Sequence, residues 1–415
     1  MDLDHPVHRR TFWAVLILGM ALRLLWVWAV PMEPVSDSQA YNLLAHTLAE
    51  HGVYGFTPSE PGAYWAVGTA AIAAATYILI GPGYEGVVAL NLLAGFLIIL
   101  LTQGVAVRYI GAGPSVMAAA IVAVWPNLIF FTSILSSELY FLALSLAGLW
   151  FWGREAGSTR VNLILCGVIW GLACYVRPVI LLVPVALLLA ELPRGLRAFA
   201  GAGLRTVGVL ALVVAVVLPW TLRNDRVLGA PVLVSTNFGP NLWMGNNPAS
   251  TGGYMALPAE VQDMGEVERA RYLGDQAKAY MAAHPAATAL RTLVKAARLH
   301  SRETIGVVWN EAALRRGLGD LGVTALKLVS SGFWYAVLLA ALTGVAICIR
   351  SVGLFAALFN PIFALWAYFT ALHAVIVVED RYHMPSSPYI AMFAAIALNA
   401  AWARRQNRNR APEAA

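Results

Sequence analysis

The chain has 415 residues, of which 60% are hydrophobic and only 12% are charged. Soluble domains carry about 25% charged residues, so the composition excludes an ordinary soluble protein and predicts a polytopic membrane protein. No nucleic-acid-binding motif accompanies the net charge of +6, which is better explained by basic flanks of membrane spans. We therefore predict membrane lipids, and no nucleic acid, as partners.

Apolar runs with few charges predict the membrane-spanning helices, because a helix needs about 20 apolar residues to cross a bilayer. The run 11–30 is predicted to be a retained first span, since no small-residue cleavage site follows it. The further candidates are 64–80, 85–107, 113–131, 137–153, 161–190, 206–222, 325–349, 352–378 and 387–403. This pattern predicts an all-α protein with about ten transmembrane helices and both termini in the cytoplasm.

Two details of these spans stay open. The run 161–190 is either one long tilted span or two short helices that meet at Arg177-Pro178. Glu155 lies between Arg154 and Arg160 in a loop whose charge is too weak to place it on either side of the membrane. If that loop is cytoplasmic, one earlier run, such as 64–80, must be re-entrant.

Basic residues predict the orientation, because positive loops stay in the cytoplasm. They are Arg194, Arg197 and Arg205 in one loop and Arg404, Arg405, Arg408 and Arg410 in the tail. The segments 31–63 and 223–324 are therefore expected outside. We predict three parts: an N-terminal transmembrane module over 1–222, an external region over 223–324, and C-terminal helices with a basic tail over 325–415.

The external region is expected to be mainly helical. A helix of mixed charge is predicted over 259–283, and His284-Pro285 should end it. A second helix, amphipathic and basic, should run to about residue 300 and either lie on the bilayer surface or dock on the spans.

The stretch VSDSQAYNLLAHTLAEHGVYG follows the first span and contains an isolated acid, Asp37. Either Ser36 or Asp37 can cap the amphipathic helix predicted over 38–51. Alternatively, Asp37 is a general base, which requires a carboxylate within hydrogen-bond reach of an acceptor hydroxyl.

Three arginines lie at the boundaries of apolar runs, where an unneeded charge is costly. Arg177 lies in CYVRPV, Arg223 in LPWTLRNDRVLG, and Arg381 in VVEDRYHMPSSPY. The planar fork of arginine suits phosphate recognition. The alternatives are a structural ion pair at Arg177 and an internally paired charge cluster over 379–383.

The segment GPNLWMGNNP supplies Asn241, Trp243, Asn246 and Asn247. Glycine and asparagine at this density are typical of turns. A tryptophan among amides also offers a sugar an apolar face and hydrogen-bond partners. The three cysteines, Cys166, Cys174 and Cys348, lie in apolar runs and predict neither a disulfide nor a metal site.

Taken in order, these segments resemble the bacterial polyprenyl-phosphate-sugar transferases of the GT-C superfamily. Within it they resemble glycosyltransferase family 39, the dolichyl-phosphate-mannose-protein mannosyltransferase-like group, whose relatives include the lipid A aminoarabinose transferase. The matching segments are RLLWVWAVPMEPVSDSQAYNLLAHTLAEHGVYG, AYWAVG, SSELYF, YVRP, PWTLRN, GPNLWMGNNP and EDRYHMPSSP. Ala66 stands where the family usually has proline, which puts any donor contact there in doubt.

The resemblance implies a GT-C bundle and an inverting glycosyltransferase in the bacterial inner membrane, with its active site facing the periplasm or exterior. A hexosyl or pentosyl group would pass from a polyprenyl monophosphate to a lipid, polysaccharide or protein acceptor. Asp37 would be the catalytic base, and Arg177, Arg223, Arg381 and Tyr382 would bind the donor phosphate. Candidate sugar or acceptor contacts are Tyr64, Glu138, Asn241, Trp243, Asn246, Glu379 and Asp380. Relatives differ in metal use, so no cofactor or metal ligand is predicted and a divalent metal stays open.

Two other functions compete with this interpretation. A transporter or flippase predicts paired broken helices and an inverted repeat, but Arg177-Pro178 is the one such break and no repeat is visible. A non-catalytic scaffold would have no need for an acid at position 37. The chain also lacks a P-loop, a GxGxxG turn, an HExxH motif and a GxSxG elbow.

Overall fold

The computed structural model describes residues 6–154 and 158–410, so the loop position of Glu155 lies outside the described residues. The described part is helical except for a hairpin of β1 (Gly55–Thr57) and β2 (Glu60–Pro61), which pair antiparallel. The α-helices are α1 (Pro6–Ala29), α2 (Asp37–His51), α3 (Val67–Leu79), α4 (Glu85–Ile110), α5 (Ala112–Ala123), α6 (Pro126–Phe130), α7 (Glu138–Trp152), α8 (Thr159–Val176), α9 (Val183–Leu189), α10 (Leu196–Leu228), α11 (Phe238–Gly245), α12 (Glu266–Ala283), α13 (Pro285–Leu299), α14 (Ile305–Val308), α15 (Glu311–Val352), α16 (Leu354–Leu358), α17 (Pro361–Val375) and α18 (Ser387–Arg410). Short 3₁₀ helices are η1 (Phe131–Ser133), η2 (Pro178–Ile180), η3 (Leu192–Arg194), η4 (Ala259–Val261) and η5 (Met384–Ser386).

The predicted all-α membrane fold is confirmed. Among the described residues, α1, α4, α8, α10 and α15 are each long and apolar enough to cross a membrane. A sixth span is possible if α5 and the segment Pro126–Ser133, bent by 57°, cross together. The other predicted runs coincide with the shorter apolar helices α3, α7 and α17 or with α18, so the total of ten crossings stays a prediction.

Proline explains where the apolar runs break. The run 161–190 is two helices, α8 and α9, joined through η2 at Arg177-Pro178, as the second of our two alternatives states. Proline disfavours helical geometry in the residue before it, and Arg177 is extended, with φ −148° and ψ 114°. The break therefore places the Arg177 side chain at a helix end, away from the regular helix surface.

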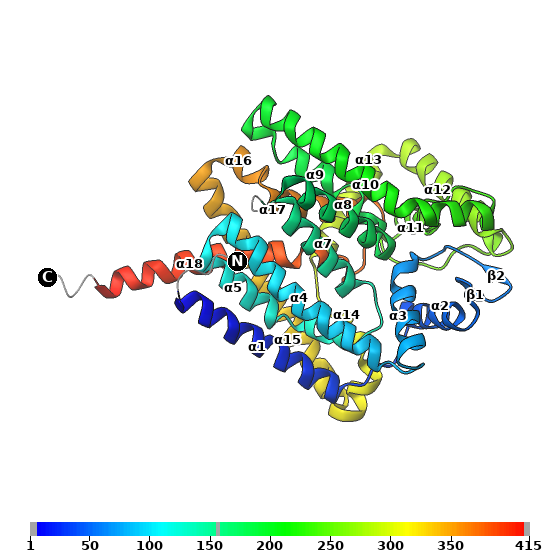
Figure 1. The fold of residues 1–415 in the computed structure, drawn as a ribbon, viewed down its shortest axis with the longest axis horizontal. Helices are drawn as coiled ribbons and strands as arrows, with labels where there is room; N and C mark the ends of the chain where they lie inside the picture. The colour runs from blue at the N-terminus through cyan, green and yellow to red at the C-terminus, as the bar shows by residue number, and fades with distance from the viewer. Residues whose placement is uncertain (1–5, 155–157, 411–415) are drawn as a thin grey trace.

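The long helices run roughly along the longest axis of the molecule (Figure 1). The end of α18 and the start of α1 lie toward one end of this axis, whereas α2, the hairpin and α12 lie toward the other. The segments predicted to be external therefore meet at one end of the bundle. Glu266 Oε1 joins them, accepting hydrogen bonds from the Ala63 backbone N–H at 2.9 Å and from Thr236 Oγ1 at 2.8 Å.

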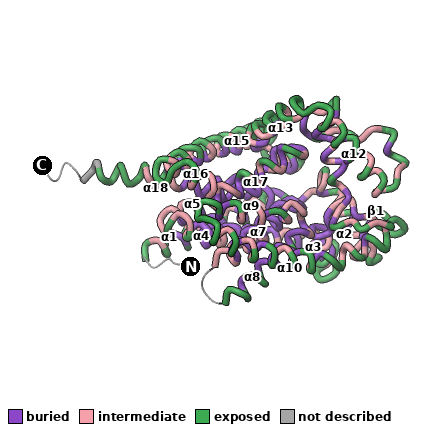
Figure 2. Tube along the Cα trace, turned by 90° about the horizontal axis from the view of Figure 1, so that it is seen from above, coloured by how far each residue is buried: buried purple, intermediate pink, exposed green. Residues whose placement is uncertain are grey.

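Buried residues follow the middle of the bundle, and exposed residues cover outer helices such as α13 and α15 (Figure 2). Trp125, Trp170 and Trp334 are fully or almost fully buried. Helices α15 and α18 approach so closely that a Cβ on Gly344 would lie 1.9 Å from the Phe393 carbonyl oxygen, so only glycine fits there. Exposed apolar side chains such as Trp28, at 83% exposure, suit a surface that faces lipid.

Helix α13 is amphipathic, but its basic side faces the protein. Lys295 is fully buried, and its Nζ donates to the carbonyls of Gly245, Val375 and Ile376 at 2.9–3.2 Å. Two of those carbonyls end α17, so α13 docks on an apolar helix that lies within a predicted span. Burial, together with the charge of Arg291, lowers the pKa of Lys295 to about 8.

Candidate functional site

The predicted helix after the first span is α2, and it begins at Asp37. The capping interpretation is wrong, because Ser36 makes no side-chain capping bond and the Asp37 carboxylate accepts a hydrogen bond from Arg381 instead. Ser36 has φ 54°, and no other non-glycine residue in the described ranges has a positive φ. Such a conformation costs ~1–3 kcal/mol and often accompanies a functional position. Here it turns the chain so that Asp37 faces the interior.

Two carboxylates and two arginines alternate at the centre of the site. Arg381 Nη2 lies 2.6 Å from Asp37 Oδ2, and Arg381 Nη1 lies 3.5 Å from Glu138 Oε1. Glu138 Oε1 also pairs with Arg177 Nη2 at 2.8 Å, and Arg177 Nε donates to Ser137 Oγ at 2.9 Å. The structure therefore brings together Asp37, Glu138, Arg177 and Arg381 from four distant segments. With two charges of each sign, the cluster is formally neutral.

The four charged side chains differ in exposure. The Glu138 side chain is 1% exposed at the first residue of α7, where the helix dipole favours a negative charge. The Asp37 side chain is 28% exposed, compared with 10% for Arg381. Asp37 is thus the carboxylate that a reactant can reach, and Glu138 supports the two arginines from behind.

Arg381 stays charged in this setting. Burial by itself lowers the pKa of Arg381, but the Asp37 carboxylate, followed by Tyr382 and Glu138, raises it well above its usual value. The Arg381 guanidinium also lies over the Trp309 ring, 4.5 Å from the ring centroid. This cation–π contact fixes the plane of the guanidinium and leaves its edge for anions.

The cluster opens into a cavity of about 860 Å³. The predicted site residues that line it are Asp37, Tyr64, Arg177, Asn241, Glu379, Arg381 and Tyr382. Burial raises the pKa of Tyr382, so its phenol keeps its proton and can donate a hydrogen bond. Apolar groups such as Val179 and Phe238 complete the lining, so the cavity suits a ligand with an anionic head and an apolar part.

Five predicted residues do not line this cavity: Glu138, Arg223, Trp243, Asn246 and Asp380. Arg223 donates to the backbone carbonyls of Gly62 and Tyr54 and so anchors the segment 31–63. Asn246 Nδ2 donates to the carbonyls at the end of α17. The side chains of Arg223 and Asn246 therefore hold neighbouring segments of the chain together.

Trp309 and His373 are among the cavity-lining residues that the sequence reasoning missed. His373 could have been found, since an ionisable residue inside an apolar run is a functional candidate. Trp309 carries no such signal, because tryptophan is common at membrane boundaries. In the residues that the structure describes, no group of three or more His, Cys, Asp and Glu side chains could hold a metal ion.

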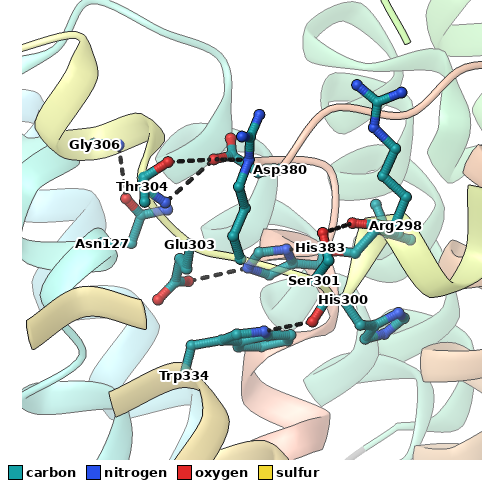
Figure 3. A network of polar contacts seen from close by, with 12 residues as sticks. Asn127, Arg298, His300, Ser301, Glu303, Thr304, Gly306, Trp334, Asp380 and His383 are labelled. Carbon is teal, nitrogen blue, oxygen red and sulfur yellow. Dashed lines mark hydrogen bonds and ion pairs between the residues drawn. The ribbon is translucent and has the colours of Figure 1, made fainter. Parts of the chain in front are cut away.

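A buried network holds the loop that carries Arg381 (Figure 3). On one side of Arg381, Asp380 Oδ2 accepts hydrogen bonds from the backbone N–H and Oγ1 of Thr304 at 3.2 and 3.0 Å. On the other side, His383 Nε2 lies 3.1 Å from Glu303 Oε1, and both side chains are fully buried. The backbone at Arg381 is therefore held in place by contacts of the neighbouring residues Asp380 and His383.

The protonation of this network follows from its partners. His383 Nδ1 lies 3.0 Å from the Leu299 carbonyl, which can only accept, so Nδ1 carries a proton. Trp125 Nε1 donates to both oxygens of Glu303, at 2.8 and 3.0 Å. One proton between His383 Nε2 and Glu303 Oε1 completes the network.

Replacing Glu303 with Ala is expected to destabilise the protein strongly. The change leaves His383 Nε2 and Trp125 Nε1 buried without their partner, and each unpaired buried polar atom costs ~1–3 kcal/mol. Thermal unfolding of the purified protein in detergent would measure the effect. Arg302→Ala is the control, because its side chain is 60% exposed and lies 3.7 Å from Asp380. Equal unfolding temperatures for the two variants would contradict the buried hydrogen-bond network.

Comparisons with known proteins find similar structures only: no family model and no curated protein sequence matches. The chain is similar to the oligosaccharyltransferase of Archaeoglobus fulgidus in the apo form, with a TM-score of 0.57 and 12% identity over 100% of this chain and 53% of that one. The oligosaccharyltransferase AglB from Archaeoglobus fulgidus, in complex with an inhibitory peptide and a dolichol-phosphate, matches with a TM-score of 0.56 and 12% identity. This match covers 100% of this chain and 52% of that one. ArnT from Cupriavidus metallidurans bound to undecaprenyl phosphate matches with a TM-score of 0.44 and 13% identity, over 93% of this chain and 77% of that one. The chain spans about half the length of the oligosaccharyltransferase.

Proposed function

Because the chain has the fold of the GT-C glycosyltransferases, we propose that it transfers a monosaccharide from a polyprenyl-phosphate donor to a hydroxyl group. The observation that carries the proposal is the alternating cluster of Asp37, Arg381, Glu138 and Arg177 at the cavity of about 860 Å³. Phosphate recognition needs such arginines, and hydroxyl activation needs a reachable carboxylate. The dolichol-phosphate held by the Archaeoglobus enzyme supports the same class of donor here.

The proposed reaction is a single displacement. The acceptor oxygen forms a bond to the anomeric carbon while the bond from that carbon to the phosphate oxygen breaks. The polyprenyl phosphate leaves with the electron pair, and Asp37 takes the proton of the acceptor hydroxyl. Attack from the face opposite the phosphate inverts the anomeric centre.

The arginines supply the electrostatic part of this proposal. Negative charge grows on the leaving phosphate, and Arg177 and Arg381 are charged donors fixed in advance by Glu138. Arg381 also holds Asp37, so a phosphate oxygen can replace the carboxylate as its partner. That exchange would release Asp37 to accept the proton.

The location and partners extend the proposal. The basic loop 194–205 and the basic tail support an active site on the outer side of the bacterial inner membrane. In the proposed division, the external region 223–324 recognises the acceptor. It lies between the transmembrane parts 1–222 and 325–415. The acceptor is a lipid, a polysaccharide or a protein hydroxyl, and the sugar is a hexose or pentose.

Deletion of the gene in its own organism tests this function. We expect mass spectrometry of surface glycans, lipids and proteins to show one product that has lost a single sugar. A plasmid carrying the wild-type gene should restore the sugar, and one carrying the Asp37→Asn variant should not. Unchanged glycans, lipids and glycoproteins in the deletion strain would contradict the proposal.

A further inference from the structure

His373 is a buried residue of α17 that the proposed reaction leaves without a role. Its residue exposure is 7%, and it lines the cavity that Asp37 and the two arginines share. Its Nε2 is buried and has no hydrogen-bond partner among the described residues. An unpaired buried polar atom costs ~1–3 kcal/mol, and in the lining of this cavity a ligand can pair with it.

The ring of Tyr382 links His373 to both arginines. The two rings are stacked, with centroids 4.7 Å apart and planes inclined by 23°. The guanidinium carbons of Arg177 and Arg381 lie 5.5 and 5.3 Å from the centroid of the same Tyr382 ring. His373 is thus held in a fixed orientation beside two positive charges.

A second unpaired donor lies in the same place. Arg177 uses Nε and Nη2 for Ser137 and Glu138, but its Nη1 is buried without a partner in the described part of the chain. A second proton on His373 would add a third positive charge beside Arg177 and Arg381, so the neutral ring is the form that fits. A neutral imidazole with its proton on Nε2 is a hydrogen-bond donor.

We propose that His373 binds the donor phosphate, with its Nε2–H donating to a phosphate oxygen beside Arg177 Nη1 and Arg381. This inference rests on the proposed function, and it adds a neutral donor to the two charged ones. An anion is the ligand that satisfies all these groups, since each of them donates and none accepts. Stacking on Tyr382 orients the imidazole ring for this bond.

Binding of undecaprenyl monophosphate to the purified full-length protein in detergent tests the proposal. His373→Phe keeps a ring to stack on Tyr382 but removes the N–H. We expect it to weaken binding roughly 10- to 100-fold, the usual effect of losing a hydrogen bond to a charged group. Its unfolding temperature without lipid should not fall, because the replaced Nε2 has no partner among the described residues.

Two amide variants separate a hydrogen bond from a packing role. The amide N–H of His373→Gln lies near the position of Nε2, whereas that of His373→Asn lies near Nδ1. We expect Gln to retain most of the wild-type affinity and Asn to lose it. Thr370→Val, a partly buried change on the same helix outside the cavity lining, is the control and should bind as wild type does.

The outcomes distinguish the proposed role of His373 from the proposed function of the protein. If the wild type binds undecaprenyl monophosphate and His373→Phe, Gln and Asn bind it equally well, the role of His373 is overturned and the proposed function stands. If the wild type binds the phosphate no better than undecaprenol, both are overturned. A loss of affinity in Gln equal to that in Asn would mean that ring packing, and not the Nε2–H bond, matters.

Discussion

Replacement of Asp37 by Asn is expected to lower the rate of sugar transfer by about 10²- to 10⁴-fold, the usual contribution of a general base. Asparagine has nearly the same shape and can still accept a hydrogen bond from Arg381, but it cannot take up the acceptor proton. Affinity for the donor should change little, because Arg177 and Arg381 remain in the cavity. Single-turnover assays with a polyprenyl-phosphate-linked sugar would measure the rate separately from binding.

A matched control for this variant is Glu33→Gln. Glu33 belongs to the same segment, 31–63, but its carboxylate is 40% exposed and pairs with Arg316 outside the cavity. The Glu33→Gln variant should transfer sugar at the wild-type rate. Near wild-type activity of Asp37→Asn would remove the assignment of Asp37 as the base.

Replacement of Arg381 by Ala is expected to weaken binding of undecaprenyl monophosphate by roughly 10²-fold, more than it affects folding. The variant loses a charged donor of the cavity and leaves the carboxylates of Asp37 and Glu138 to repel the phosphate. The loop should stay folded, because Asp380 and His383 anchor it on either side. Arg381→Lys should recover part of the affinity, since lysine keeps the charge and loses the planar fork.

Arg223→Ala is the comparison variant for Arg381→Ala. The sequence analysis predicted that both arginines bind the donor phosphate, but Arg223 donates to the carbonyls of Tyr54 and Gly62 and does not line the cavity. We expect it to lower the unfolding temperature and to leave affinity for undecaprenyl monophosphate within a few-fold of wild type. Unchanged binding in Arg381→Ala together with a large loss in Arg223→Ala would reverse the two roles.

The local sequence indicated some of the places where helices end. The predicted break at His284-Pro285 separates α12 from α13, and the break at Arg177-Pro178 was one of our two alternatives, because proline lacks an N–H and restricts the residue before it. The break before Pro361, inside the run 352–378, was not predicted. The capping interpretation of Asp37 failed for a non-local reason. A cap competes with every other partner of the carboxylate, and Arg381 lies 344 positions away along the chain.

The sequence by itself determined that this is an all-α membrane protein and that a few polar residues interrupt its apolar runs, since hydropathy and helix length are local properties. It could not determine which of those residues meet. Arg177, Arg223 and Arg381 carry the same charge at similar boundaries, yet two line the cavity and one anchors a loop. Only the tertiary structure decided this, because the cost of burying a charge makes a partner necessary without specifying which partner the fold supplies.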